Sequence, residues 1–95
     1  MENNKQLDDY RSSIDNIDAA LVFLLAERFR VTEKVGLYKK NNSLPSRDSA
    51  RESRQIARLN ELSVSSGMNR DFLERFFKLI TDEVVRRHDE IREES

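Results

Sequence analysis

Arg28 interrupts an otherwise apolar pattern. Two seven-residue series run along the first part of the chain: Leu7, Ile14, Leu21, Arg28, Val35, and Tyr10, Ile17, Leu24, Val31, Tyr38. Apolar side chains at this spacing are typical of a helix that packs along a narrow face against other helices. A guanidinium keeps its charge there, so it needs an anionic partner or a hydrated cavity. Arg28 is therefore the first residue to examine for binding chemistry.

Two further cations belong to the same predicted helix. Lys39 follows Arg28 by eleven residues, or three helical turns, so both project from nearly the same face. Arg11 lies about a quarter-turn off that face and roughly 25 Å away along the axis. Within one chain it cannot readily reach the ligand of Arg28, but in an antiparallel dimer it could enter the partner's site. Converging cations of this kind describe a receptor for a small polyanion.

Each of these cations also has a simpler interpretation. Lys39 could be a solvated lysine at a helix end, and Arg11 could form a surface salt bridge with Asp15. Arg28 could be a structural ion pair across a dimer interface.

A second polar group stands near the start of the next predicted helix: Asp48, Arg51 and Glu52. Arg51 adds a cation, and Glu52 adds an acceptor suited to a hydroxyl, since a carboxylate beside cations stays ionised. A ligand with carboxylates and a hydroxyl would match both groups. The alternative is that Asp48 and Glu52 only cap a helix and that Arg51 is an exposed surface residue.

His88 is the single histidine and falls on an apolar helix face with Phe77, Ile80 and Val84. It is either a partly buried histidine near a helix C-terminus, favoured there by the helix dipole, or a hydrogen-bond donor that points into a cavity. Helical periodicity alone does not separate these interpretations.

Three helices must position these residues, in an all-α fold of one long and two shorter helices. Periodicity and capping signals place them at about residues 6–40, 48–65 and 70–91, within one domain that covers residues 1–95. Gly36 lies inside the first helix, where we expect it to be tolerated and to let a neighbouring group approach the backbone closely.

The length of the first helix predicts an assembly. About thirty-five residues span roughly 50 Å, whereas a compact globule of this size has a radius of gyration of only about 12 Å. A lone chain cannot cover such a helix along its length. We therefore expect an obligate, intertwined homodimer.

Composition excludes several classes of protein. The 95 residues hold 17 basic and 18 acidic side chains, whereas a nonspecific nucleic-acid binder usually shows a basic excess. No cysteine and one histidine argue against disulfides and a zinc site. No apolar run approaches membrane-spanning length, and the polar stretch 1–7 does not resemble a signal peptide, so we expect a cytoplasmic protein.

In the order of its motifs, the chain resembles the all-helical class of chorismate mutases. The resembling stretches are Arg11-x-x-Ile14-x-x-Ile17-Asp18, Leu24-Leu25-Ala26-Glu27-Arg28, Val35-Gly36-x-x-Lys39, Pro45-x-x-Asp48-x-x-Arg51-Glu52, and Phe77-x-x-Ile80-x-x-x-Val84-x-x-x-His88. The resemblance implies a domain-swapped homodimer with two equivalent active sites. It also implies the rearrangement of chorismate to prephenate, on the route to phenylalanine and tyrosine.

The resemblance assigns the substrate contacts on the first helix. Arg28 holds one carboxylate within its own chain, and Arg11 of the partner chain holds the other. Lys39 donates to the ether oxygen and the nearby carboxylate. The reaction is unimolecular and pericyclic, so it needs no nucleophile, metal or cofactor. It needs a near-attack conformation and donors for the growing charge on the ether oxygen.

The remaining contacts come from the other two helices. By resemblance, Asp48 and Glu52 engage the ring hydroxyl, and Arg51 adds positive potential. His88 stands where many members carry glutamine and others glutamate, and it can donate to the ether oxygen. We therefore expect activity that is sensitive to pH across the histidine titration range. Val84 stands where some members carry a hydroxyl residue, so one polar contact with the substrate is absent.

Three alternatives remain. An isochorismate-pyruvate lyase, which forms salicylate, shares the fold and substrate class, although those lyases have a degraded Asp48–Arg51–Glu52 signature. A helical dimerisation module would have no catalysis. A weak mutase could depend on an activating partner enzyme of the aromatic pathway; we expect no fused second domain, so any regulation would come from such a partner or be absent.

Overall fold

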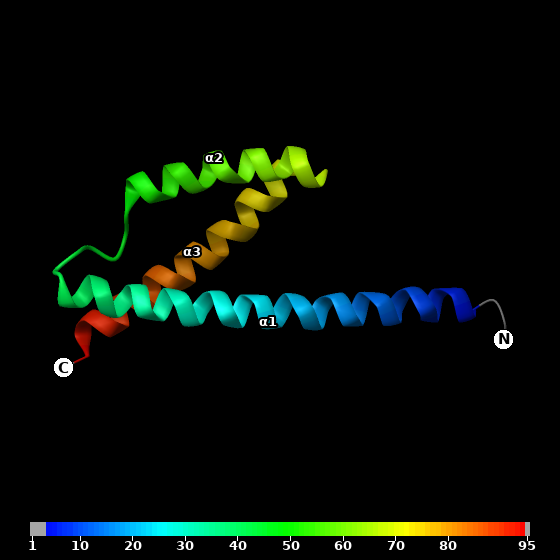
Figure 1. Ribbon diagram of the computed structural model, residues 1–95, viewed down its shortest axis with the longest axis horizontal. Coiled ribbons are helices and arrows are strands. Elements are labelled where there is room, and N and C mark those ends of the chain that lie inside the picture. Colours follow the sequence, from blue (N-terminus) through cyan, green and yellow to red (C-terminus); the bar gives the residue numbers. More distant parts are fainter. Residues whose placement is uncertain (1–3, 95) are drawn as a thin grey trace. The chain divides into compact units, whose positions relative to one another are not determined.

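The computed structural model describes residues 4–94 and is all-helical in that range, without strands (Figure 1). Its elements are α1 (Lys5–Asn41), α2 (Ser49–Ser66) and α3 (Arg70–Glu93). The prediction of one long and two shorter helices is confirmed. The predicted domain includes residues 1–3 and 95, which lie outside the described residues.

Local capping chemistry sets the ends of α2 and the start of α3. The Asp48 side chain accepts a hydrogen bond from the Arg51 backbone N–H at 3.0 Å, which satisfies a donor that the first turn leaves free. Gly67 ends α2 in the left-handed conformation, at φ 77°, which glycine adopts without steric cost. Asn69 then caps α3 by accepting from the Phe72 N–H at 2.8 Å.

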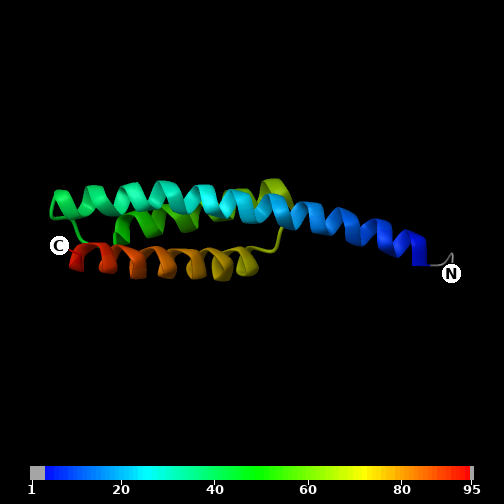
Figure 2. The same cartoon turned by 90° about the horizontal axis from the view of Figure 1, so that it is seen from below.

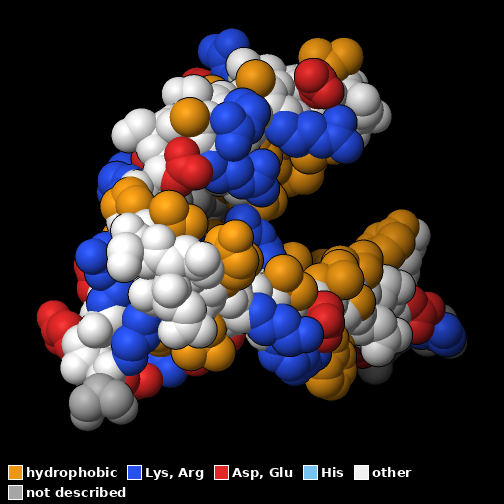
Figure 3. All heavy atoms as spheres, turned by 60° about the vertical axis from the view of Figure 1, so that its left-hand side comes forward, with side chains coloured by type: hydrophobic (Ala, Val, Ile, Leu, Met, Phe, Trp, Pro, Cys, Tyr) orange, Lys and Arg blue, Asp and Glu red, His pale blue; other side chains and the backbone are white. Residues whose placement is uncertain are grey.

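The chain divides between Val31 and Thr32 into two compact units. In the described part of the first unit, α1 is regular, and most of its large apolar side chains are exposed in the single chain: Leu7, Tyr10, Ile14, Ile17, Leu21, Val22, Phe23, Leu24 and Val31. Exposed hydrophobic side chains are visible on the molecular surface in Figure 3. So many exposed large apolar side chains on one helix indicate an interaction face.

The second unit contains the end of α1 together with α2 and α3. Its buried apolar side chains are Leu59 of α2 and Leu73, Ile80 and Ile91 of α3. Figures 1 and 2 both show the C-terminal end of α3 beside the end of α1. The core of this unit is therefore small and drawn mainly from α3.

Gly36 permits the close contact between α1 and α3. A Cβ at this position would lie 2.7 Å from Cδ2 of His88 and 2.7 Å from Cδ1 of Ile91. Both neighbours are almost fully buried. The expectation that Gly36 admits a neighbour to the helix backbone is confirmed.

An ion-pair network also joins these two helices. Arg87 of α3 donates to both carboxylate oxygens of Glu33 on α1, at 2.9 and 2.7 Å, and its Nη1 lies 3.4 Å from Glu90 and 3.1 Å from Glu94. The hydrogen bond from Arg87 lowers the pKa of Glu33, and the bond to Glu33 raises that of Arg87. A bidentate pair fixes geometry as well as charge.

No helix within the described range is long and apolar enough to cross a membrane.

Candidate functional site

The structure divides the predicted site residues between the two units. Arg11, which is exposed, and Arg28, which is half-buried, belong to the first unit. Six residues belong to the second unit: Lys39, Asp48, Arg51, Glu52, Val84 and His88. The geometry of the second unit can therefore be examined by itself.

Lys39 is held by the loop that follows its helix. Its side chain is partly buried, and Nζ donates to the backbone carbonyl of Ser46 at 2.9 Å. Ser46 is itself buried. An ammonium has three donors, so two remain for a ligand after this contact. Lys39 is thus not a freely solvated lysine at a helix end.

The group at the start of α2 combines capping with an ion pair. Asp48 is the N-cap, as the simpler interpretation expected, and Arg51 is exposed. Glu52 is more enclosed, with 29% of its side chain exposed, and its Oε1 accepts a hydrogen bond from Nη1 of Arg47. The carboxylate of Glu52 is therefore already oriented by a cation.

Sequence reasoning missed Arg47 and its partners. The Nη2 of Arg47 lies 3.4 Å from Oδ1 of Asp82 on α3, and Oδ2 of Asp82 accepts from Lys78 at 2.8 Å. The hydrogen bonds from Lys78 and then Arg47 lower the pKa of Asp82. The pair of Lys78 with Asp82 has the i,i+4 spacing that sequence could have suggested. No pattern in the sequence indicates that Arg47 reaches a residue so far along the chain.

These charged residues border a cavity of about 340 Å³ between α2 and α3. Its apolar lining is formed by Ile56, Leu59 and Phe77, and its polar lining by Arg47, Glu52, Gln55, Glu74, Lys78, Thr81 and Asp82. The hydroxyl of Thr81 lies 3.4 Å from the amide oxygen of Gln55 across this space. Glu52 is the predicted site residue that lines the cavity.

His88 is held tightly against α1. It is 2% exposed, and its Nε2 lies 2.8 Å from the carbonyl oxygen of Thr32. A carbonyl only accepts, so Nε2 carries the proton of this hydrogen bond. The other ring nitrogen, Nδ1, is buried and has no hydrogen-bond partner among the described residues. Val84, one turn earlier on α3, is half-buried.

The fold and these residues together indicate the kind of ligand that the protein can bind. The chain is all-helical, and its second unit places a partly buried ammonium, an oriented carboxylate and a buried imidazole on its three helices. Such groups can bind a small anionic molecule and stabilise charge without forming a covalent bond to it.

Residues 10–89 match the family described as chorismate mutase type II, and the chain belongs to this family of isomerases. Two similar proteins are bifunctional chorismate mutase/prephenate dehydratases. The one from Buchnera aphidicola subsp. Schizaphis graminum (strain Sg) is 34% identical over 85 residues, and the one from Buchnera aphidicola subsp. Acyrthosiphon pisum (strain APS) is 33% identical over 85 residues. Each match covers 90% of this chain but 22% of the relative, so the chain spans about a fifth of their length.

Proposed function

We propose that this chain converts chorismate to prephenate by a Claisen rearrangement, on the route to phenylalanine and tyrosine. The observation that carries the proposal is the family match over residues 10–89, which contains every predicted site residue. The partly buried Lys39 and the oriented Glu52 support it. Both would be available to a substrate with carboxylates, a ring hydroxyl and an ether oxygen.

The chemistry requires placement and charge stabilisation. The ether C–O bond breaks as a new C–C bond forms within one molecule, and no proton is transferred. Arg28 and Arg11 of a second copy would hold the two carboxylates, which favours the near-attack conformation. Lys39 would donate to the ether oxygen as negative charge grows there. One such preorganised donor typically contributes about 3–4 kcal/mol.

The start of α2 would hold the ring. Oε1 of Glu52 is engaged by Arg47, which leaves Oε2 to accept from the ring hydroxyl. Asp48 would contribute to the same contact, and Arg51 would add positive potential beside the substrate carboxylates. Val84 offers no hydrogen bond at its position.

His88 has a more restricted role than its residue type suggests. Its Nε2–H is directed to the Thr32 carbonyl, so Nδ1 is the nitrogen left for the substrate. A neutral ring carries a single N–H, which Thr32 already uses. Nδ1 can donate to the ether oxygen only when the ring is protonated. The imidazolium is therefore the catalytic form in this proposal.

A second copy of the chain would complete the site as an intertwined, domain-swapped homodimer. The support is that every apolar member of the two seven-residue series is exposed in the single chain: Leu7, Tyr10, Ile14, Ile17, Leu21, Leu24, Val31, Val35 and Tyr38. Paired first helices would bury these side chains and would bring Arg11 to the partner's site. Burial of large aliphatic side chains contributes about 1.5–3 kcal/mol each.

The direct test is to incubate the purified protein separately with chorismate and with isochorismate. Prephenate from chorismate is the expected result. Salicylate from isochorismate alone would instead identify a lyase, and no turnover of either would favour a dimerisation module. Activity that appears only in lysate, and not in purified protein, would indicate an activating partner enzyme.

A further inference from the structure

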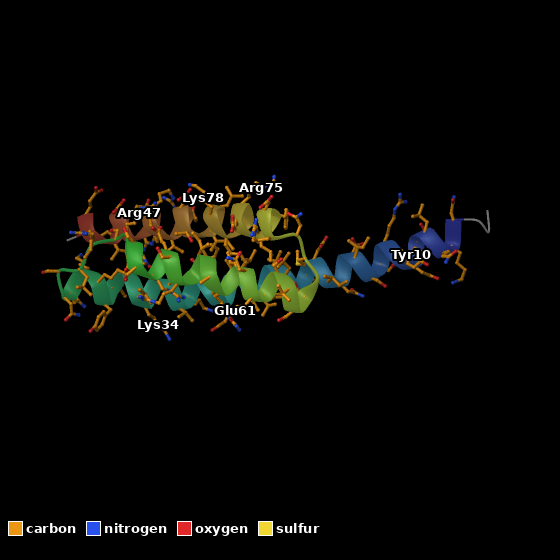
Figure 4. The ribbon with its side chains drawn as sticks, turned by 90° about the horizontal axis from the view of Figure 1, so that it is seen from above. Tyr10, Lys34, Arg47, Glu61, Arg75 and Lys78 are labelled. Atoms are coloured by element: carbon orange, nitrogen blue, oxygen red, sulfur yellow. The ribbon has the colours of Figure 1, made fainter. Side chains whose placement is uncertain are left out.

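Arg47 connects two helices through a single side chain. It lies in the loop directly before the N-cap of α2, and its guanidinium contacts Glu52 on the first turn of α2 and Asp82 on α3. Figure 4 shows Arg47 and Lys78 toward the α3 edge of the second unit. All four of these charged side chains line the cavity between α2 and α3.

The two loop residues next to Arg47 also form hydrogen bonds with predicted site residues. The carbonyl of Ser46 accepts from Lys39, and the side chain of Asp48 accepts from the backbone of Arg51. Three consecutive loop residues therefore each contact a residue proposed to act on the substrate. Arg47 is the one whose contact also reaches α3.

The chemistry of a guanidinium suits this bridge. Its planar fork can donate to two carboxylates at once, whereas a lysine ammonium acts as a point charge on a flexible stem. The second oxygen of Asp82 is bound by Lys78, and the pKa of Asp82 is lowered, so Asp82 stays ionised as an anchor on α3. Arg47 thus has a fixed acceptor on one side and Glu52 on the other.

We propose that Arg47 is a positioning residue that orients Glu52 for the ring hydroxyl of the substrate, using Asp82 as its anchor on α3. This inference rests on the proposed chorismate mutase function. Because the hydroxyl contact exists in both the bound substrate and the transition state, Arg47 acts mainly on substrate binding. Its loss should therefore appear in KM more than in kcat.

The test compares Arg47→Ala with Arg58→Ala in a chorismate mutase assay. Arg58 is a matched control, because it is an arginine on α2 that forms an ion pair with Glu61 of the same helix. Figure 4 shows Glu61 at the opposite edge of the second unit. Arg47→Ala is expected to raise KM roughly tenfold with kcat within about threefold of wild type. Arg47→Lys, which keeps the charge, should recover part of this loss, and Arg58→Ala should match wild type.

An unchanged KM for Arg47→Ala would overturn the inference, whether or not kcat falls. A fall in kcat alone gives no support, because a partly unfolded preparation lowers the active fraction without changing KM.

A double-mutant cycle tests whether Arg47 acts through Glu52. In a Glu52→Gln background, Arg47→Ala should add little to the rise in KM, because the group it orients has already changed. Asp82→Asn should raise KM in the same direction but by a smaller factor. Full additivity of Arg47→Ala and Glu52→Gln would mean that Arg47 acts elsewhere, and would refute the positioning role.

The two claims fail in different ways. A wild-type protein without turnover removes the proposed function, whereas normal turnover with a wild-type KM in Arg47→Ala removes this inference alone. The coupling of Arg47 to Glu52 is also measurable without substrate, by the same cycle on the free energy of unfolding. Zero coupling there would overturn the inference whatever the activity.

Discussion

At the scale of single residues, the proposed catalytic role of Lys39 depends on the partial burial of its ammonium group. Lys34 is exposed on α1, whereas Lys39 is partly buried and bound to the Ser46 carbonyl. A donor held in place needs no reorganisation when charge develops on the substrate. The chemical difference between these two lysines therefore comes from their surroundings.

Lys39→Ala should lower kcat for chorismate by about two to three orders of magnitude, the usual cost of removing one preorganised donor. The circular dichroism spectrum should stay helical, because Lys39 is not one of the buried core residues. Lys34→Ala is the control and should keep wild-type turnover. Near-native kcat in Lys39→Ala would refute the assignment of Lys39.

His88 gives a pH prediction with a definite sign. Since Nε2–H is used by Thr32, donation from Nδ1 requires the imidazolium, so kcat should fall as the pH rises. The nearby carboxylate of Glu33 has a lowered pKa, mainly because it accepts a hydrogen bond from Arg87. The charge of His88 lowers the pKa of Glu33 further. His88→Gln donates at any pH and should flatten this part of the pH–rate profile. An identical slope in His88→Gln would contradict the prediction.

Much of this site could be predicted from residue types and spacing, and the remainder depends on packing between distant segments. Arg28 stands out because a cation in an apolar series needs an explanation, and Lys39 stands out because it lies three helical turns from Arg28 on nearly the same face. The contacts of Arg47 with Asp82 and of His88 with Thr32 join residues far apart in the chain. No periodic pattern specifies such a pair, because it depends on how α3 lies against its neighbours.

At the scale of the helices, local signals account for the fold more fully. The apolar periodicity, the Asp48 cap and the Gly67 terminator are all short-range, and each acts where the sequence indicates. The sequence also indicated a close approach to α1, because a glycine, Gly36, lies inside that helix. Its partners, His88 and Ile91, could not be identified without the packing.

Gly36→Ala should destabilise the protein although alanine is the better helix former. The propensity gain is about 1 kcal/mol, whereas overpacking a closed contact typically costs about 1–3 kcal/mol. Here the new Cβ would meet two buried side chains at 2.7 Å, so the overpacking cost should win. Thermal unfolding measures the loss, and Ile91→Val should relieve part of it. Gly67→Ala is the control, because nothing lies within 4 Å of its Cβ and Ile91→Val should not relieve its strain.

The ion pair between α1 and α3 should make stability depend on pH in the acid range. The pKa of Glu33 is lowered in the folded protein, mainly by its hydrogen bond from Arg87. Its contribution is therefore present above the ordinary glutamate range and is lost as the pH falls through the folded pKa. Glu33→Gln should be less stable than wild type at neutral pH, with a difference that shrinks on acidification. Glu61→Gln, at an exposed pair, should show a much smaller difference in chemical denaturation.

At the scale of the whole molecule, the single chain leaves its longest helix with too little cover. The exposed residue Ile17 belongs to the apolar series, whereas Ala19, also exposed, projects from the opposite face because two residues rotate a helix by about 200°. Ile17→Lys should therefore dissociate the proposed dimer at micromolar concentration, and Ala19→Lys should leave it intact. Sedimentation velocity separates these outcomes, and a folded wild-type monomer at that concentration would refute the dimer.

The sharing of residues between copies has its own test, which uses two inactive variants. In the proposed dimer each site takes Arg28 from one chain and Arg11 from the other. Arg11→Ala and Arg28→Ala homodimers should both lose activity, since each lacks one carboxylate ligand at both sites. After the two variants are unfolded together and refolded at equal amounts, half the dimers should be mixed, and each mixed dimer has one intact site. Random pairing thus predicts recovery of about a quarter of wild-type activity. No recovery above the separate variants would mean that Arg11 and Arg28 act within one chain, or that Arg11 does not contact the substrate.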